Sequence, residues 1–245
     1  MLRWLRGQWD TICFIKGLRL CLKGSCGETG KCRIGKMRPE KEVGMENIEK
    51  TLIFLGSSVT YGAASGGVAF PEYIAEGNGC KMIKEAVSGT TLVDNGPDSY
   101  ISRMKGIDKT LKADLFMCQL STNDATQKKP LGRISETGSY DTSTVAGAIE
   151  YIISYAKDTW NCPVVFYTNP RYDSKEYAAM VELLSDIAEK WGIKEIDLWN
   201  DEDFNAITEA QRKQYMADPI HPTREGYLQW WTPYMENFLK GMGIL

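Results

Sequence analysis

The chain has 245 residues, of which 43% are hydrophobic and 25% are charged, and this balance is ordinary for a globular protein. The length accommodates one sizeable domain with a full core and does not require two. The formal net charge of −3 gives no basis for nucleic-acid binding, and no apolar run approaches the roughly 18 residues that span a bilayer.

Residues 1–45 differ in composition from the rest, because they are rich in Lys and Arg and hold four of the seven Cys. Their longest apolar run, Ile12–Ile15, is shorter than the apolar region of about 7–15 residues that a signal peptide requires. A membrane-surface helix over 2–22 is disfavoured, because Lys16 falls on its apolar face. We therefore expect 1–45 to be a poorly ordered N-terminal extension and 46–245 to be the catalytic domain, without stable membrane insertion.

The remaining Cys and the single His bear on location and cofactors. Cys80, Cys118 and Cys162 fall in or beside apolar runs, where a free thiol behaves as a small hydrophobe. Free thiols persist in reducing compartments, so the pattern favours a cytoplasmic location. His221 is the only His, which leaves a metal site with carboxylates and Cys alone, and we expect neither a metal nor another cofactor.

From residue 51 onwards, apolar runs of strand length alternate with segments of helical period. The expected strands are 51–56, 81–87, 114–120, 163–168 and 193–198. The expected helices are 69–77, 99–105, one from a cap at Thr142 or Ser143 to 160, 174–191, 206–216 and a final helix capped by Thr223. Strands separated by helices imply right-handed crossovers and a mostly parallel sheet covered on both faces.

One connection stands out by its length. Residues 125–141 form a loop of about 17 residues between an expected strand and helix, and loops this long in a compact domain often serve as lids or binding loops.

Unusual polar residues follow three of the expected strands, at 57–58, 88–89 and 123–124. The carboxyl ends of parallel strands lie at one edge of a sheet, so these residues can converge although they are distant in sequence. The segment 218–221 follows the last strand and can return to the same edge.

These residue types are those that acyl transfer needs. A serine hydroxyl such as that of Ser58 becomes a nucleophile when a base takes its proton, and His221 suits that task. A carboxylate on the other ring nitrogen orients the base, and Asp218 lies one helical turn away. The Ser58 amide, the Gly89 amide and the Asn123 side-chain amide are available as donors for an oxyanion.

The sequence blocks 56–60, 89, 121–124 and 218–222 resemble, in this order, the SGNH hydrolase (GDSL-type lipase/acylhydrolase) family. The resemblance covers about residues 50–242. It implies a flavodoxin-like three-layer α/β/α sandwich with a five-stranded, mostly parallel sheet.

The same resemblance implies roles for individual residues. Ser58 is the expected nucleophile, His221 the base and Asp218 the group that orients it. Gly89 and Asn123 complete the expected oxyanion hole with the Ser58 amide.

The chain departs from the family pattern at two positions. Ser57 stands where the family usually has Asp, and Ser121 stands where it usually has Gly two residues before the Asn. The first change leaves two adjacent serines as candidate nucleophiles. We favour Ser58 over Ser57, because Thr60 follows it at the spacing of the family pattern.

The expected function is a serine hydrolase that acts on a small-molecule carboxylic ester through an acyl-enzyme, such as an acetyl group on a carbohydrate. Two alternatives stay open. The loop 57–60 could instead cradle the phosphate of a nucleotide or flavin, although this leaves Asp218 and His221 unexplained. The chain could also be an inactive homologue. The sequence leaves the oligomeric state open.

Overall fold

The structure is a computed structural model that describes residues 9–15, 18–24 and 49–245. Two compact units divide the chain, 1–47 and 48–245. In the first, β1 (Trp9–Ile15) and β2 (Leu18–Gly24) pair as an antiparallel hairpin. The expected poor order of residues 1–45 falls mostly outside the described residues and stays a prediction.

The second unit is built on a sheet of five parallel strands in the order β4-β3-β5-β6-β7. The strands are β3 (Thr51–Gly56), β4 (Lys81–Ala86), β5 (Leu115–Gln119), β6 (Val164–Tyr167) and β7 (Lys194–Ile196). This is the flavodoxin-like strand order. The second strand of the sheet, β4, is added on one side of β3, and the later strands are added on the other side, so the order switches between β3 and β5. The predicted five-stranded α/β fold is confirmed, and the sheet is parallel throughout.

The central strand β3 shows why apolar runs form this sheet. All of its residues are buried, and successive side chains point to opposite faces. Leu52 and Phe54 enter one core, while Ile53 and Leu55 enter the other. A strand that is apolar on both faces requires helices on both sides.

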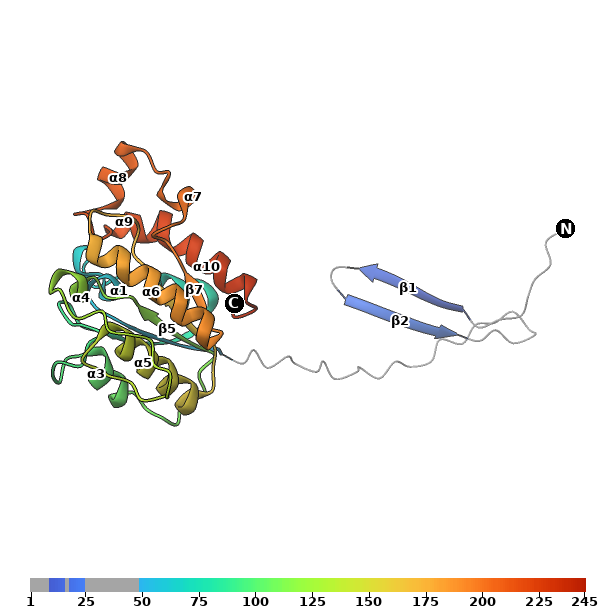
Figure 1. Cartoon of the computed structure of the whole chain (residues 1–245). Helices are drawn as coiled ribbons and strands as arrows, with labels where there is room; N and C mark the ends of the chain where they lie inside the picture. Colours follow the sequence, from blue (N-terminus) through green and yellow to red (C-terminus); the bar gives the residue numbers. More distant parts are fainter. Residues whose placement is uncertain (1–8, 16–17, 25–48) are drawn as a thin grey trace, which may run out of the picture. The chain divides into compact units, whose positions relative to one another are not determined.

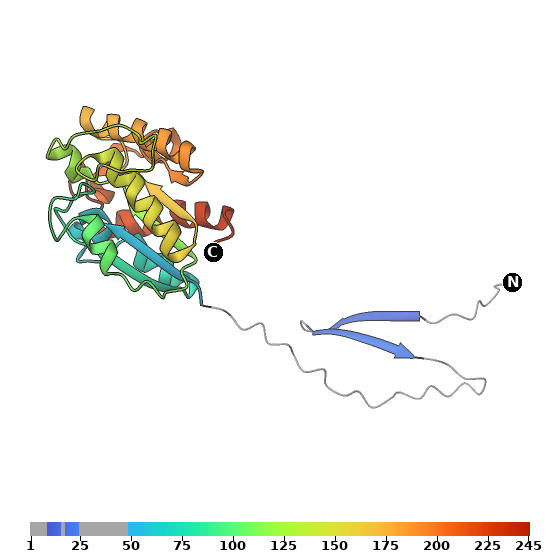
Figure 2. The ribbon, with the colours of Figure 1, turned by 60° about the horizontal axis from the view of Figure 1, so that its bottom comes forward.

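Helices form the two outer layers. The longer ones are α2 (Phe70–Asn78), α3 (Tyr100–Gly106), α5 (Val145–Trp160), α6 (Lys175–Trp191), α8 (Glu209–Tyr215) and α10 (Thr232–Gly241). Short turns are α1 (Ser58–Tyr61), η1 (Ala63–Ser65), α4 (Thr122–Thr126), α7 (Glu202–Asn205), α9 (Arg224–Gly226) and the π-helical η2 (Tyr227–Trp231). Helices α3, α5 and α6 cover one face, with α5 and α6 side by side, and α2, α7, α8 and α10 cover the other (Figures 1 and 2).

The helix expected over 206–216 is present as α8, which lies within that range. A further short helix, α7, precedes it and was not expected. Asp201 caps α7 by accepting the amide of Phe204, and Thr208 caps α8 by accepting the amide of Gln211. Each of the two helices therefore begins at its own capping side chain.

Two other boundaries shift for the same kind of reason. The hydroxyl of Thr144 accepts the amide of Gly147, so α5 begins at Val145 rather than after a cap at 142 or 143. Helix α4 takes the first residues of the expected loop and shortens it. In the described ranges, no helix combines the length and the apolar character needed to cross a membrane.

Candidate active site

Ser58 lies at the carboxyl end of the central strand. β3 ends at Gly56, and Ser58 is the first residue of the single-turn helix α1. The turn is tight enough that a Cβ on Gly56 would lie 1.7 Å from the hydroxyl of Thr60. Glycine is therefore required there, and the sharp turn directs Ser58 away from the sheet, with 6% of the residue exposed.

His221 and Asp218 reach this serine from the far end of the chain. The Ser58 hydroxyl lies 2.8 Å from His221 Nε2, and His221 Nδ1 lies 2.7 Å from Asp218 Oδ2. With the ring proton on Nδ1, the ring donates to the carboxylate and Nε2 accepts the serine hydroxyl. The structure thus brings together the three side chains expected from the sequence, in one hydrogen-bonded chain.

The turn that carries His221 is fixed by its own backbone. Asp218 Oδ1 accepts the amides of Ile220 and His221, each at 2.8 Å. The amide of Ala217 donates to the carbonyl of His221 at 2.9 Å, and the Asn169 side chain donates to the carbonyl of Ile220 at 3.0 Å. The ring is therefore held in place before any substrate binds.

The same contacts decide the charge of Asp218. Burial alone would raise its pKa, but the two amides and the His221 ring together lower the pKa below its ordinary value. Asp218 therefore stays ionised at neutral pH, as a group that stabilises an imidazolium must.

Two further expected residues, Gly89 and Asn123, lie on neighbouring elements. Gly89 follows β4 in a turn with φ of +82°, which favours glycine. Asn123 is in α4, after β5, and its side-chain N–H donates to the carbonyl of Thr90 at 3.0 Å. The contact joins the Gly89 turn to α4, and the amide group has a second N–H for a ligand.

Ser121 has a local role that explains why a residue larger than glycine fits there. It caps α4, because its hydroxyl accepts the amide of Asn123 at 3.2 Å and also donates to the carbonyl of Thr90 at 3.3 Å. The departure from the family pattern at 121 therefore adds contacts on the Asn123 turn.

Ser57 points away from the His221 ring. It is fully buried, and its amide and hydroxyl both donate to the side-chain oxygen of Gln119, at 2.9 and 3.3 Å. The same oxygen accepts the Thr60 hydroxyl at 2.9 Å, which lies 2.6 Å from the Tyr167 hydroxyl. The two adjacent serines thus face different environments.

The sequence analysis missed Gln119. The residue is a polar side chain at the end of an otherwise apolar strand, and it is completely buried. A buried amide needs partners, and this is the signal that could have marked it.

Arg103 was also missed, and it fixes the backbone around the candidate nucleophile. Its guanidinium donates to the carbonyls of Gly56 and Glu85, each at 2.9 Å, and to the hydroxyl of Thr90 at 3.0 Å. Its side chain is only 8% exposed. One buried cation therefore joins the ends of β3 and β4 to the turn that carries Gly89.

Across the described residues, no group of three His, Cys, Asp or Glu side chains is arranged to hold a metal ion.

Several solved structures share the fold. A protein of Lactobacillus plantarum aligns over 79% of this chain and 97% of its own, with a TM-score of 0.67 and 19% identity. A candidate GDSL-like lipase from Bacteroides ovatus aligns over 79% and 99%, with a TM-score of 0.60 and 18% identity. A family two carbohydrate esterase from Clostridium thermocellum, in complex with cellohexaose, aligns over 80% and 66%, with a TM-score of 0.57 and 13% identity.

At these identities the structural similarities bear on the fold alone. None of the curated proteins matches the chain. The family described as GDSL-like lipase/acylhydrolase matches residues 54–228, which include the Ser58 turn and the Asp218–His221 turn. The chain therefore belongs to the GDSL-like lipase/acylhydrolase family, and this membership indicates an ester hydrolase.

Proposed function

We propose that the chain is a serine esterase that hydrolyses carboxylic esters through an acyl-enzyme. The observation that carries the proposal is the pair of consecutive hydrogen bonds from Ser58 to His221 and from His221 to Asp218, in a member of an acylhydrolase family. A nucleophile, a base and an orienting carboxylate at these distances are the arrangement that acyl transfer uses.

The proposed reaction has two stages. Ser58 Oγ attacks the ester carbonyl while His221 Nε2 takes the hydroxyl proton, and Asp218 stabilises the imidazolium. His221 then gives that proton to the departing alcohol, which leaves an acyl group on Ser58. In the second stage His221 activates a water molecule that releases the acid and restores the serine.

The negative charge on the carbonyl oxygen needs donors at both stages. We assign this role to the amides of Ser58 and Gly89 and to the side chain of Asn123. Removing one such donor typically lowers kcat by about 10²–10³-fold.

For the substrate we propose a small acyl group, such as acetyl on a carbohydrate, within a small-molecule ester. The fold is shared with a carbohydrate esterase bound to cellohexaose, which supports the carbohydrate part of this proposal. We also propose a cytoplasmic location, because Cys80, Cys118 and Cys162 are free thiols, and cell fractionation is its test.

The phosphate-binding alternative is disfavoured by the orientation of the 57–60 loop. A phosphate cradle needs backbone amides that point outward. The amides of Ser57 and Thr60 instead donate inward to Gln119, at 2.9 and 3.4 Å. The inactive-homologue alternative is disfavoured because the contacts from Ser58 to His221 and from His221 to Asp218 are both intact.

The test is hydrolysis of p-nitrophenyl acetate and butyrate by the full chain. We expect turnover by the wild type, a fall of at least about 10³-fold in kcat for Ser58→Ala, and retained turnover for Ser57→Ala. Wild-type protein that is folded but does not hydrolyse either ester would contradict the proposal. Loss confined to Ser57→Ala would transfer the nucleophile to Ser57.

A further inference from the structure

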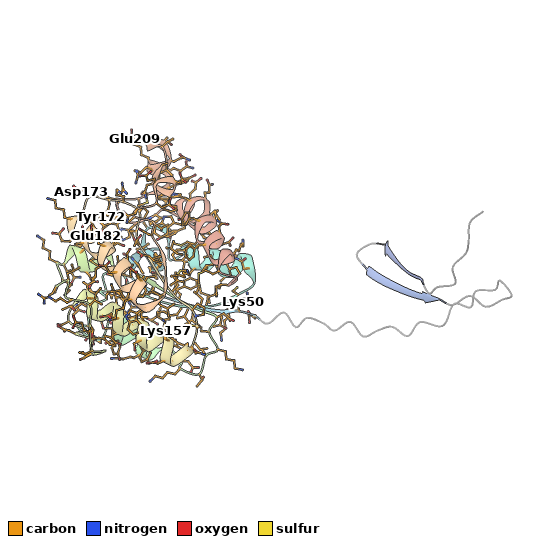
Figure 3. All side chains as sticks on the ribbon, turned by 45° about the vertical axis from the view of Figure 1, so that its right-hand side comes forward. Lys50, Lys157, Tyr172, Asp173, Glu182 and Glu209 are labelled. Atoms are coloured by element: carbon orange, nitrogen blue, oxygen red, sulfur yellow. The ribbon has the colours of Figure 1, made fainter. Side chains whose placement is uncertain are left out.

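A pocket of about 340 Å³ adjoins the turn that carries His221. Its walls come from the loop after β6, from α8 and from the Asp218 turn. The lining residues are Arg171, Tyr172, Asp173, Arg212, Lys213, Met216, Asp218 and Pro219. Tyr172 and Asp173 lie at the end of the domain opposite Lys50, which precedes β3, and so at the carboxyl edge of the sheet (Figure 3).

Two cations of this pocket have no carboxylate partner among the residues that the structure describes. Within the described residues, no Asp or Glu oxygen lies at salt-bridge distance from Arg171 or Arg212, whereas Lys213 pairs with Glu209 at 2.9 Å. Arg171 donates its Nε to the carbonyl of Trp199 at 3.3 Å, which leaves its terminal nitrogens for another acceptor. Two guanidiniums in one pocket of an acidic protein favour an anionic ligand.

The two carboxylates of the pocket keep their negative charge but do not engage the guanidiniums. Both oxygens of Asp218 are occupied by the His221 ring and by backbone amides. Asp173 and Arg171 are both exposed, and among the described residues no ion pair joins them. The two guanidiniums therefore keep N–H groups that no described carboxylate accepts.

The rest of the lining is apolar. Met216 and Pro219 contribute aliphatic surface, and the Tyr172 ring packs against Trp199 at 5.4 Å between ring centroids. Burial raises the pKa of Tyr172, so its hydroxyl stays neutral and does not repel an anion. A cationic rim over apolar surface fits an oxyanion carried on a compact ring.

The position of the pocket relates it to one part of the ester. His221 must reach the departing alcohol with Nε2, so the leaving group lies over the ring rather than over the oxyanion donors. Asp218, which orients the ring, lines the pocket, whereas His221 itself and the proposed oxyanion donors Gly89 and Asn123 do not. Helix α8 is tied to the same turn, because the amide of Met216 donates to the backbone carbonyl of Arg212 and the amide of Ala217 donates to the backbone carbonyl of His221, both at 2.9 Å.

Resting on the proposed esterase function, we propose that this pocket binds a carboxylate or phosphate group on the alcohol part of the ester, held by Arg171 and Arg212. The enzyme then selects esters of acidic alcohols, such as acylated sugar acids or sugar phosphates, over neutral ones.

The test uses matched acetyl esters with one leaving-group skeleton. 4-Acetoxybenzoate and 4-acetoxyphenyl phosphate carry the anion, 4-acetoxybenzamide is the neutral match, and each rate is normalised to hydrolysis by hydroxide. Monophenyl adipate and its terminal amide place the same charge on the acyl side. The readout is the anionic-to-neutral ratio of kcat/KM on one enzyme preparation, which cancels differences in active fraction.

We expect a ratio of about 10 for at least one leaving-group anion, the size of one charge-assisted hydrogen bond. The ratios for 4-acetoxybenzoate and 4-acetoxyphenyl phosphate show whether the pocket prefers a carboxylate or a phosphate. The ratio should fall towards one in Arg171→Gln combined with Arg212→Gln, and added salt should lower it. Arg224→Gln is the matched control, because Arg224 is exposed, close to His221 in sequence and outside the pocket. Its ratio should match the wild type.

A wild-type ratio near one for both leaving-group anions overturns the pocket proposal. A preference confined to the acyl-side anion also overturns it, as does a fall of the ratio in Arg224→Gln equal to that in the double Arg variant. Ser58-dependent hydrolysis of the neutral amide keeps the proposed function intact in each of these cases. Without any hydrolysis, binding of 4-hydroxybenzoate and 4-hydroxybenzamide to the wild type is compared by calorimetry. Equal binding then overturns both proposals, whereas a preference for the benzoate that the double Arg substitution removes supports the pocket alone.

Discussion

Two adjacent serines have different environments because one residue separates a strand from a helix. Ser57 lies between β3 and α1, and its hydroxyl donates to Gln119, whereas Ser58 begins α1 and its hydroxyl contacts His221. A strand alternates its side chains between faces, and the sharp turn at Gly56 then sets which hydroxyl leaves the core. The sequence spacing to Thr60 favours the same residue.

Gln119 holds the loop 57–60 in place through hydrogen bonds to its buried side-chain oxygen. Its oxygen accepts the amides of Ser57 and Thr60 as well as the Thr60 hydroxyl, while its side-chain nitrogen is buried without a partner among the described residues. The residue therefore acts as an acceptor only. It positions the Ser58 turn without contact to the reacting atoms.

We expect Gln119→Leu to lower kcat about 10–100-fold with little change in KM, because a small displacement of Ser58 spoils its alignment with His221. Unfolding free energy should fall by about 1–3 kcal/mol, since buried donors lose their acceptor. Steady-state kinetics and urea unfolding are the measurements.

Gln119→Glu is the matched variant, because a protonated carboxyl keeps the acceptor oxygen and replaces only the unpartnered nitrogen. It should keep more of kcat than the leucine variant. Equal kcat in both variants would show that the acceptor does not position Ser58.

The sequence predicted Ser58, Asp218 and His221 because each belongs to a short local pattern. Gln119 and Arg103 belong to no such pattern. Their partners Ser57 and Gly56 lie 62 and 47 positions away in the sequence, so only the folded sheet defines their roles. The sequence therefore indicated the candidate nucleophile, base and orienting carboxylate, but not the side chains that hold their backbone in place.

At the scale of elements, each strand lies within two residues of its expected range. For β3, β5 and β6 the signal was a mainly apolar run that is buried throughout. The edge strands β4 and β7 are only partly buried. Helix α8 lies within its expected range of 206–216, whereas the short helix α7 was missed, since its start depends on the capping side chain of Asp201. Helix propensity over so short a segment is a weak signal.

The edge strand β7 carries a poorly solvated carboxylate, Glu195. Burial raises its pKa to about 7, helped by nearby Asp197 and opposed by the Ser185 hydroxyl, which donates to it at 2.9 Å. One of its oxygens is buried without a partner among the described residues. Because the folded pKa is raised, the folded state holds its proton longer than the unfolded chain. Stability is therefore lost as pH rises from the ordinary Glu value towards 7.

We expect Glu195→Gln to raise the free energy of unfolding at pH 8 and to leave it almost unchanged at pH 4.5. The reason is that the amide carries no charge, whereas the buried carboxylate is charged at the higher pH. The gain at pH 8 should be on the order of 1–2 kcal/mol, reduced by the solvent that reaches this half-buried group. In a domain of this size it corresponds to about 2–8 °C in Tm. Thermal unfolding at both pH values measures it.

The exposed Glu182 on α6 provides the control, and Glu182→Gln should leave the pH dependence of Tm as in the wild type. A Glu195→Gln variant whose Tm follows the wild type at both pH values would contradict the buried-carboxylate interpretation.

At the scale of the whole molecule, the elements that build the candidate site all belong to the unit 48–245. That unit contains both hydrophobic cores and its own five-stranded sheet. A sheet covered on both faces within one segment can fold as a unit. The hairpin of β1 and β2 is a separate element, and the sequence analysis did not identify it.

Removal of residues 1–45 should therefore leave kcat/KM within about twofold and shift Tm by less than about 3 °C, because the residues of the candidate site and of both cores lie within 48–245. Ester hydrolysis and thermal unfolding of the truncated and full chains test this directly. Insoluble or inactive truncated protein would show that the N-terminal segment is part of the folding unit.

The central claim is that Ser58, activated by His221, is the residue that becomes acylated. A fluorophosphonate probe forms a covalent bond with an activated serine, and fragmentation of the labelled peptide separates Ser58 from its neighbour Ser57. We predict one probe per chain, located on Ser58, with labelling abolished in His221→Ala. Label on Ser57, or no label on folded wild-type protein that binds its ester, would contradict the account.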